Sequence, residues 1–221
     1  MKQNSGNVLF MILAGIVLFA GLTYAVTQAN ESGENVDQEQ LRIDIAEFIS
    51  NMEVLRTTIG AMKARGIADN QISFEYTGGH AGYVNANCTS DACRIFHPSG
   101  GGLTYVNAAD SISTDSESIR FNGSDPFHGH GTDGASAASS DLFARVATTE
   151  AACIEYNRMV DFTDFVPNTG PDVQIANLRF GGTYTYNSYE VDEAEYYSVK
   201  TFCTQHPTNH GYSIYYVLLA R

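Results

Sequence analysis

The sequence predicts an α+β protein in which an N-terminal transmembrane helix and an amphipathic helix precede an antiparallel β-sheet tied by two disulfides. Three observations predict this class: an uncharged apolar run at residues 8–26, a helical apolar period over residues 41–62, and short strand-like runs from residue 71 onward. The expected parts are a leader at 1–6, a transmembrane helix at 7–29, a kink and amphipathic helix at 30–66, and a disulfide-bonded β-rich extracytoplasmic domain at 67–221.

The apolar run Val8 to Val26 is the first element. At about 1.5 Å per residue its roughly 19 residues approach the ~30 Å of a bilayer's hydrocarbon core, so the lipid bilayer is its expected partner. Lys2 precedes the run and acidic residues follow it, which predicts a cytoplasmic N-terminus and an exported remainder. A cleaved secretory signal and a permanent single-span anchor are alternative interpretations.

Ser5-Gly6 stands directly before the apolar residues, with Lys2 as the one basic side chain upstream. This arrangement resembles the prepilin leader of type IV pilin-like and pseudopilin-like proteins of Gram-negative bacteria. The resemblance implies cleavage between Gly6 and Asn7, a long N-terminal helix, and self-association through the N-terminal helices. Met11 stands at the fifth position after this cut, where a typical pilin has Glu.

Length and net charge limit the number of domains and the kinds of binding partner. With 221 residues the chain can form one domain of ordinary size plus an anchor. Its formal net charge of −13 and the absence of any cluster of Lys and Arg argue against binding to nucleic acid.

Four cysteines follow the apolar run, in a region expected to be outside a reducing compartment, and an even number there predicts disulfides. Cys88 and Cys93 are close enough to pair across a short loop, which leaves Cys153 to pair with Cys203. A zinc site is the alternative, but one C-x4-C with two distant cysteines lacks the paired spacing of zinc ribbons.

A second helix is expected from Asp37, which forms a capping box with Gln40, to a stop at Gly66. A kink or a short break is expected before it, at Glu31–Asn35, because this stretch is poor in helix formers. Apolar residues recur at intervals of three and four along the helix, namely Leu41, Ile45, Phe48, Ile49, Met52, Leu55, Ile59 and Met62. This face packs either on the chain's own core or also against neighbouring subunits.

Short strands are expected at 72–76, 83–84 and 119–121, with hairpins joining 94–96 to 103–106 and spanning 178–186. The apolar run Tyr212–Arg221 predicts a central strand. A helical region is expected over 142–159, with Thr148 or Thr149 as the cap of its last helix. Cys153 and Asn157 resemble a Cys-x-x-x-Asn helix of some pilin-like proteins, in which the cysteine pairs with the C-terminal strand region.

Candidate functional residues are few. Asp125, His128, His130 and Asp133 could ligate a transition metal, although the surrounding glycines favour a flexible surface loop. Glu190, Asp192, Glu193 and Glu195 form an acidic patch whose spacing is not that of an EF-hand. The glycines after His97 lack the Lys-Ser/Thr of a phosphate loop.

No catalytic residue and no cofactor are therefore expected. The resemblance implies a non-enzymatic, single-pass inner-membrane subunit whose C-terminal domain is periplasmic or extracellular, and which assembles into a filament. The alternatives are a membrane-anchored binding module that does not polymerise, and a metal-dependent enzyme that uses the His128/His130 loop.

Overall fold

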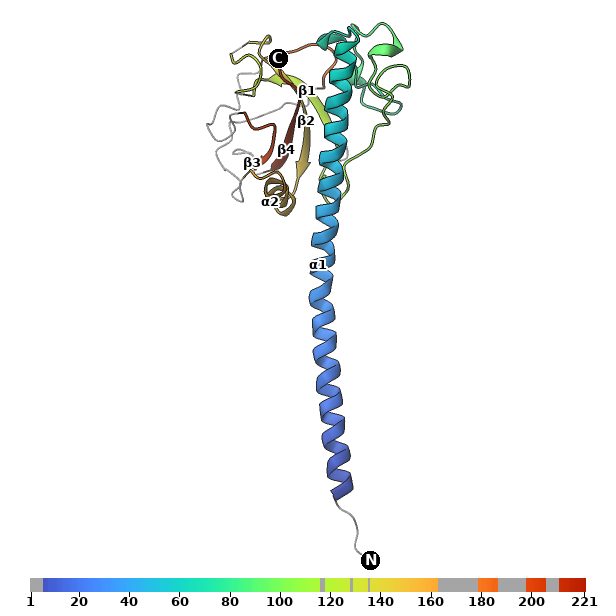
Figure 1. The fold of residues 1–221 in the computed structure, drawn as a ribbon, viewed down its shortest axis with the longest axis vertical. Helices are drawn as coiled ribbons and strands as arrows, with labels where there is room; N and C mark the ends of the chain where they lie inside the picture. Colours follow the sequence, from blue (N-terminus) through green and yellow to red (C-terminus); the bar gives the residue numbers. More distant parts are fainter. Residues whose placement is uncertain are drawn as a thin grey trace, which may run out of the picture. The chain divides into compact units, whose positions relative to one another are not determined.

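A computed structural model describes residues 6–115, 118–127, 129–134, 136–162, 179–186, 198–205 and 211–221. The chain divides into two compact units, Met1–Leu41 and Arg42–Arg221. The second unit contains an antiparallel four-stranded sheet, helices and two disulfides, which confirms the α+β class (Figure 1).

The helix α1, Gly6–Ala64, is one α-helix of 59 residues. A break at Glu31–Asn35 and a separate helix start at Asp37 are wrong, because both lie inside α1, while the kink stays a prediction. A single glycine such as Gly33 costs a helix interior only about 1 kcal/mol, and the helix-forming residues after it offset that cost.

In the second unit, the apolar face of α1 is buried as the 3.6-residue period predicts. The buried side chains are at most 4% exposed and comprise Ile45, Phe48, Met52, Leu55, Ile59 and Met62. Gly66 follows the helix in a left-handed conformation with φ +93°, and the Ile67 amide donates back to the Met62 carbonyl at 3.2 Å. Glycine adopts this conformation without a steric penalty, so the predicted stop at Gly66 is confirmed.

The sheet comprises β1 (Arg120–Asp125), β2 (Asp141–Thr148), β3 (Thr201–Gln205) and β4 (Tyr212–Leu219) in the order β1-β2-β4-β3. All three pairings are antiparallel. The central position predicted for the last apolar run is confirmed, since β4 lies between β2 and β3 and is buried from Ser213 to Leu218.

The helix α2, Glu150–Met159, connects β2 to the remainder of the sheet and lies next to β3 and β4 (Figure 1). The Thr149 side chain accepts a hydrogen bond from the Ala152 amide, which confirms Thr149 as the N-cap. Residues 142–148, expected to be helical, form strand β2 instead, because they pair with β4 from Leu142 to Thr148.

The segment between α1 and β1 contains no strand among its described residues. It contains the short 3-10 helices Asp69–Gln71, Ala81–Tyr83 and Asp91–Cys93, and one isolated parallel bridge from Ser73 to Arg94. The strands predicted at 72–76, 83–84, 94–96 and 103–106 are therefore wrong. No strand forms over 179–186 either, although the Phe180 and Thr185 amides donate to β1 at Phe121 and Gly123. Residue 178 of that predicted hairpin lies outside the described residues.

Candidate functional site

Both predicted disulfides are present. Cys88 pairs with Cys93 across five residues, and Cys153 of α2 pairs with Cys203 of β3 across 50 residues. The second is buried, since Cys153 and Cys203 are both 0% exposed.

Asn157 reinforces the Cys153–Cys203 link from the next turn of α2. Its amide nitrogen donates to the Cys203 carbonyl at 2.8 Å, and its amide oxygen accepts from the Cys203 N–H at 2.7 Å. Because Asn157 lies four residues after Cys153, both side chains project from the same face of α2. The Cys-x-x-x-Asn pattern thus holds one strand residue through a covalent bond and two hydrogen bonds.

Two sets of ion pairs attach α1 to the rest of the second unit. Lys200 bonds the Glu53 carboxylate at 2.5 Å, and Arg56 bonds its other oxygen at 3.0 Å. Partial burial pushes the pKa of Glu53 upward, but the hydrogen bonds from Lys200 and Arg56 oppose it and lower the pKa to about 2. Glu155 of α2, almost fully buried, similarly accepts from Arg42 and Arg158, each at 2.7 Å.

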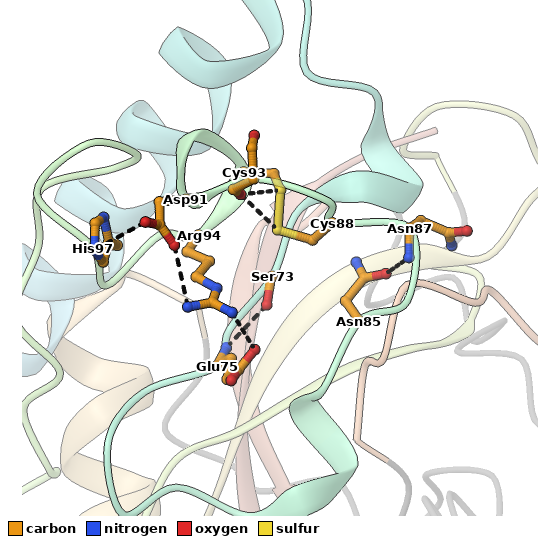
Figure 2. Close-up of polar contacts among 10 residues, drawn as sticks. Ser73, Glu75, Asn85, Asn87, Cys88, Asp91, Cys93, Arg94 and His97 are labelled. Atoms are coloured by element: carbon orange, nitrogen blue, oxygen red, sulfur yellow. Dashed lines mark hydrogen bonds and ion pairs between the residues drawn. A yellow bond between two sulfur atoms is a disulfide. The ribbon is translucent and has the colours of Figure 1, made fainter.

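The Cys88–Cys93 loop has its own set of charged contacts, drawn in Figure 2. Asp91 lies between Arg94, at 3.3 Å, and His97, at 3.6 Å, and Arg94 reaches on to Glu75 at 3.5 Å. All four side chains are more than a third exposed, so these pairs are screened by solvent and contribute little to stability.

In the glycine-rich turn after His97, the backbone lies close against the preceding segment 91–95, and no β-hairpin forms. A Cβ on Gly100 would collide with the Arg94 carbonyl oxygen and lie 2.7 Å from that of Asp91, and Gly101 is equally tight against Ile95. Only Gly102 has a positive φ, of +70°. This turn binds its own backbone, with the Gly100 and Gly102 amides both donating to the His97 carbonyl at 2.9 Å.

The candidate metal loop is folded around hydrogen bonds of its own. The Asp133 carboxylate accepts from the Gly129 amide at 2.9 Å, and the His130 amide donates to the Phe127 carbonyl at 3.1 Å. The buried Nε2 of His130 has no partner in the described part of the chain. His128 and the side chain of Asp125 lie outside the described residues, so this metal site stays a prediction.

No group of three His, Cys, Asp or Glu side chains suited to a metal ion occurs among the residues that the structure describes. The predicted acidic patch at Glu190, Asp192, Glu193 and Glu195 lies outside the described residues.

Asp141 was not among the residues predicted from the sequence, and the structure buries it completely at the start of β2. Its carboxylate accepts from the Phe127 and Arg221 amides, both at 2.9 Å. Burial nevertheless raises the pKa of Asp141 to about 6. The Arg221 guanidinium lies 3.7 Å from the Tyr184 ring centre and bonds Asp69 at 3.1 Å, which ties the end of the sheet to the turn after α1.

Two adjoining cavities lie beside α1 in the second unit. The smaller, of about 90 Å³, lies between Met52 and Leu55 of α1 and the segment 103–106. The larger cavity, of about 130 Å³, is lined by Asp44 and Glu47 of α1. Asn51, Val106 and Ile119 line both cavities, so together they form one groove. The sequence did not predict it, because its two walls are about 50 residues apart.

In the first unit, the described side chains of α1 include three large apolar residues that are strongly exposed, Ile16 at 64%, Val17 at 63% and Phe19 at 70%. Within the residues whose side chains are described, no helix is long and apolar enough to cross a membrane. Most of the predicted span Val8 to Val26 lies outside those residues, as do the side chains at the predicted Gly6–Asn7 cleavage site.

Comparison with protein-family models, with curated proteins and with solved structures finds no match to this chain. Any function must therefore be argued from the residues and their arrangement.

Proposed function

We propose that this protein is a non-enzymatic pilin-like or pseudopilin-like subunit, held in the inner membrane by the N-terminal part of α1 and assembled into a filament. The contrast between the two parts of α1 supports this proposal. Ile16, Val17 and Phe19 are exposed, whereas the apolar face from Ile45 to Met62 is buried in the chain's own second unit. Large apolar side chains that their own chain leaves exposed are stabilised by lipid or by neighbouring subunits.

The attachment between α1 and the sheet fits the same proposal. The buried face of α1 and the ion pairs Glu53–Lys200 and Arg42–Glu155 supply that attachment. The two disulfides fit folding in an oxidising compartment outside the cytoplasm.

The experiment compares two variants of the full-length chain expressed in its own cells. In the test variant, Val17→Asp and Phe19→Asp place two carboxylates in the expected lipid-contacting segment, at a cost of roughly 3 kcal/mol each at the centre of a membrane helix. In the control, Val84→Asp changes a valine that is 61% exposed in the second unit.

Membrane fractionation and immunoelectron microscopy of shed surface material give the readout. The wild-type chain and Val84→Asp should remain with membranes and label filaments, while the double variant should lose both properties. Retention of membrane binding and filaments by the double variant would contradict the proposal.

A second candidate is a membrane-anchored binding module that does not polymerise, which the groove beside α1 favours. Membrane association without labelled filaments would identify this alternative.

A further inference from the structure

The groove beside α1 has one wall that is suited to pairing with another strand. Along this wall the side chains alternate, with Leu103 and Tyr105 partly buried and Thr104 and Val106 exposed. This period of two indicates an extended backbone. Tyr105 faces inward, where its ring stacks on Tyr76 with the ring centres 4.0 Å apart.

The backbone of this wall is unpaired. Neither the N–H nor the C=O group of any residue from Thr104 to Asn107 makes a hydrogen bond with the described part of the chain. The preceding Leu103 amide donates to Ile95 at 3.2 Å, and the following Ala108 amide donates to the Ser118 hydroxyl at 3.0 Å, so the free stretch is fixed at both ends. A fixed extended segment with free backbone groups is a template for an added strand.

The groove combines an apolar end with an acidic end. The smaller cavity is flanked by Val54, 49% exposed, and Val106, 51% exposed. The larger cavity is lined by Asp44 and Glu47, and the residues that line the two cavities, all of them described, include no lysine or arginine. Such a site favours a ligand that presents an apolar side chain next to a positive charge.

We propose that this groove binds an extended segment of a partner protein as an added β-strand along Thr104–Asn107. One apolar side chain of the segment fills the smaller cavity, and a Lys or Arg two residues away lies on the same face of the strand, next to Asp44 and Glu47. The acidity of the chain, with 25 Asp and Glu against 12 Lys and Arg, favours a basic partner over a second copy. This inference goes beyond the filament proposal and does not depend on it.

The test uses the full-length chain in detergent micelles and a fluorescent, end-blocked probe peptide of sequence Thr-Lys-Thr-Leu-Thr-Lys-Thr. Its leucine has a lysine two residues away on each side, so the peptide fits in either direction. A peptide with both lysines replaced by glutamate tests the charge requirement. A third peptide, N-methylated along one edge, tests the strand hydrogen bonds.

Fluorescence anisotropy should show saturable binding of the lysine peptide and at least tenfold weaker binding of the other two. Hydrogen–deuterium exchange should show slower exchange at Thr104–Asn107 when the peptide is bound. Glu47→Lys should weaken binding of the lysine peptide at least tenfold and strengthen binding of the glutamate peptide. Val54→Glu should abolish binding, while the matched control Val84→Glu should leave it unchanged.

Three results would overturn the proposal. One is unchanged exchange at Thr104–Asn107 in the presence of the peptide. Another is equal weakening by Val54→Glu and Val84→Glu. The third is an absence of peptide binding together with self-association that Val54→Glu removes, which would assign the groove to a second copy. None of these results depends on whether filaments form.

Discussion

The region of the sheet and α2 and the region between α1 and β1 are stabilised in different ways. The sheet region has three antiparallel strand pairings, with register shifts at Asn122/Asp125 and at Leu142/Phe143, and the buried Cys153–Cys203 bond joins segments 50 residues apart. The region between α1 and β1 has one isolated bridge, a five-residue disulfide loop, and an aromatic cluster in which Phe74 stacks on Phe121 with ring centres 4.1 Å apart. The first region therefore combines backbone pairing with a buried side-chain cluster on the sheet, whereas the second depends on side-chain packing and close backbone approach.

The largest expected effect is on the sheet region. Replacing Cys153 and Cys203 together with alanine should lower the free energy of unfolding by about 4 kcal/mol, because the chain-entropy cost of closing a loop grows with its length. Urea unfolding followed by near-UV circular dichroism of the tyrosines measures this, since the chain has no tryptophan. A loss of unfolding free energy below about 1 kcal/mol would contradict this, and would mean that the Asn157 hydrogen bonds and the strand pairing hold α2 to β3 without the disulfide.

The sheet region should also be sensitive to pH through Asp141. Burial raises the pKa of Asp141 from 3.8 to about 6, so the folded state binds a proton more tightly than the unfolded state. Stability from this group is present at pH 4 and falls as the pH rises through 6, by about 3 kcal/mol in all. Urea unfolding at pH values from 4 to 7 measures the slope.

Asp141→Asn is the control for that slope. The variant should be less stable overall, because the Phe127 and Arg221 amides bond two different oxygens of Asp141 and asparagine replaces one of these with an NH₂ donor, yet it should lose the fall between pH 4 and 6. An unchanged slope in the variant would assign the pH dependence to other groups.

The region between α1 and β1 should respond to added volume. Gly100→Ala should destabilise the protein by about 2 to 3 kcal/mol, because its Cβ would strike backbone oxygens that cannot rotate away. Gly60→Ala is the matched control, since Gly60 lies in α1 with no atom within 4 Å of an added Cβ. That substitution should stabilise the helix by up to about 1 kcal/mol. Thermal unfolding of both variants measures the two changes in stability. Equal changes for Gly100→Ala and Gly60→Ala would contradict the prediction.

The smallest expected effect comes from the short disulfide. Replacing Cys88 and Cys93 with alanine should cost about 2 kcal/mol, since a loop of five residues loses little entropy on closure. The same urea experiment compares the unfolding free energy that each disulfide contributes. A cost equal to that of the Cys153–Cys203 pair would remove the distinction between the two regions.

The sequence predicted the elements whose stability is local or strongly periodic. The buried face of α1, the Thr149 cap and the strand Tyr212–Leu219 follow from helix periodicity, capping chemistry and a continuous apolar run. The strands predicted at 72–76, 94–96 and 103–106 are wrong because aromatic residues at alternating positions suit an aromatic cluster as well as a sheet. The apolar pattern of Leu142, Phe143 and Val146 is compatible with a helix as well as with a strand. Pairing with β4, which is distant in the sequence, makes this segment a strand.

The candidate site was less predictable than the fold. The disulfide pairs followed from the number and spacing of the cysteines. The groove and the buried Asp141 did not, because both depend on which distant segments come together. Asp141 is buried because it packs against Phe127 and Arg221, which lie 14 and 80 residues away in the sequence.

The most direct test of the account is the intact mass of the protein extracted from membranes. A pilin-like subunit processed as proposed begins at Asn7, so its mass should equal that of residues 7–221 less the four hydrogens lost in forming two disulfides. A full-length chain that begins at Met1, or a cut after residue 20, would contradict the central claim.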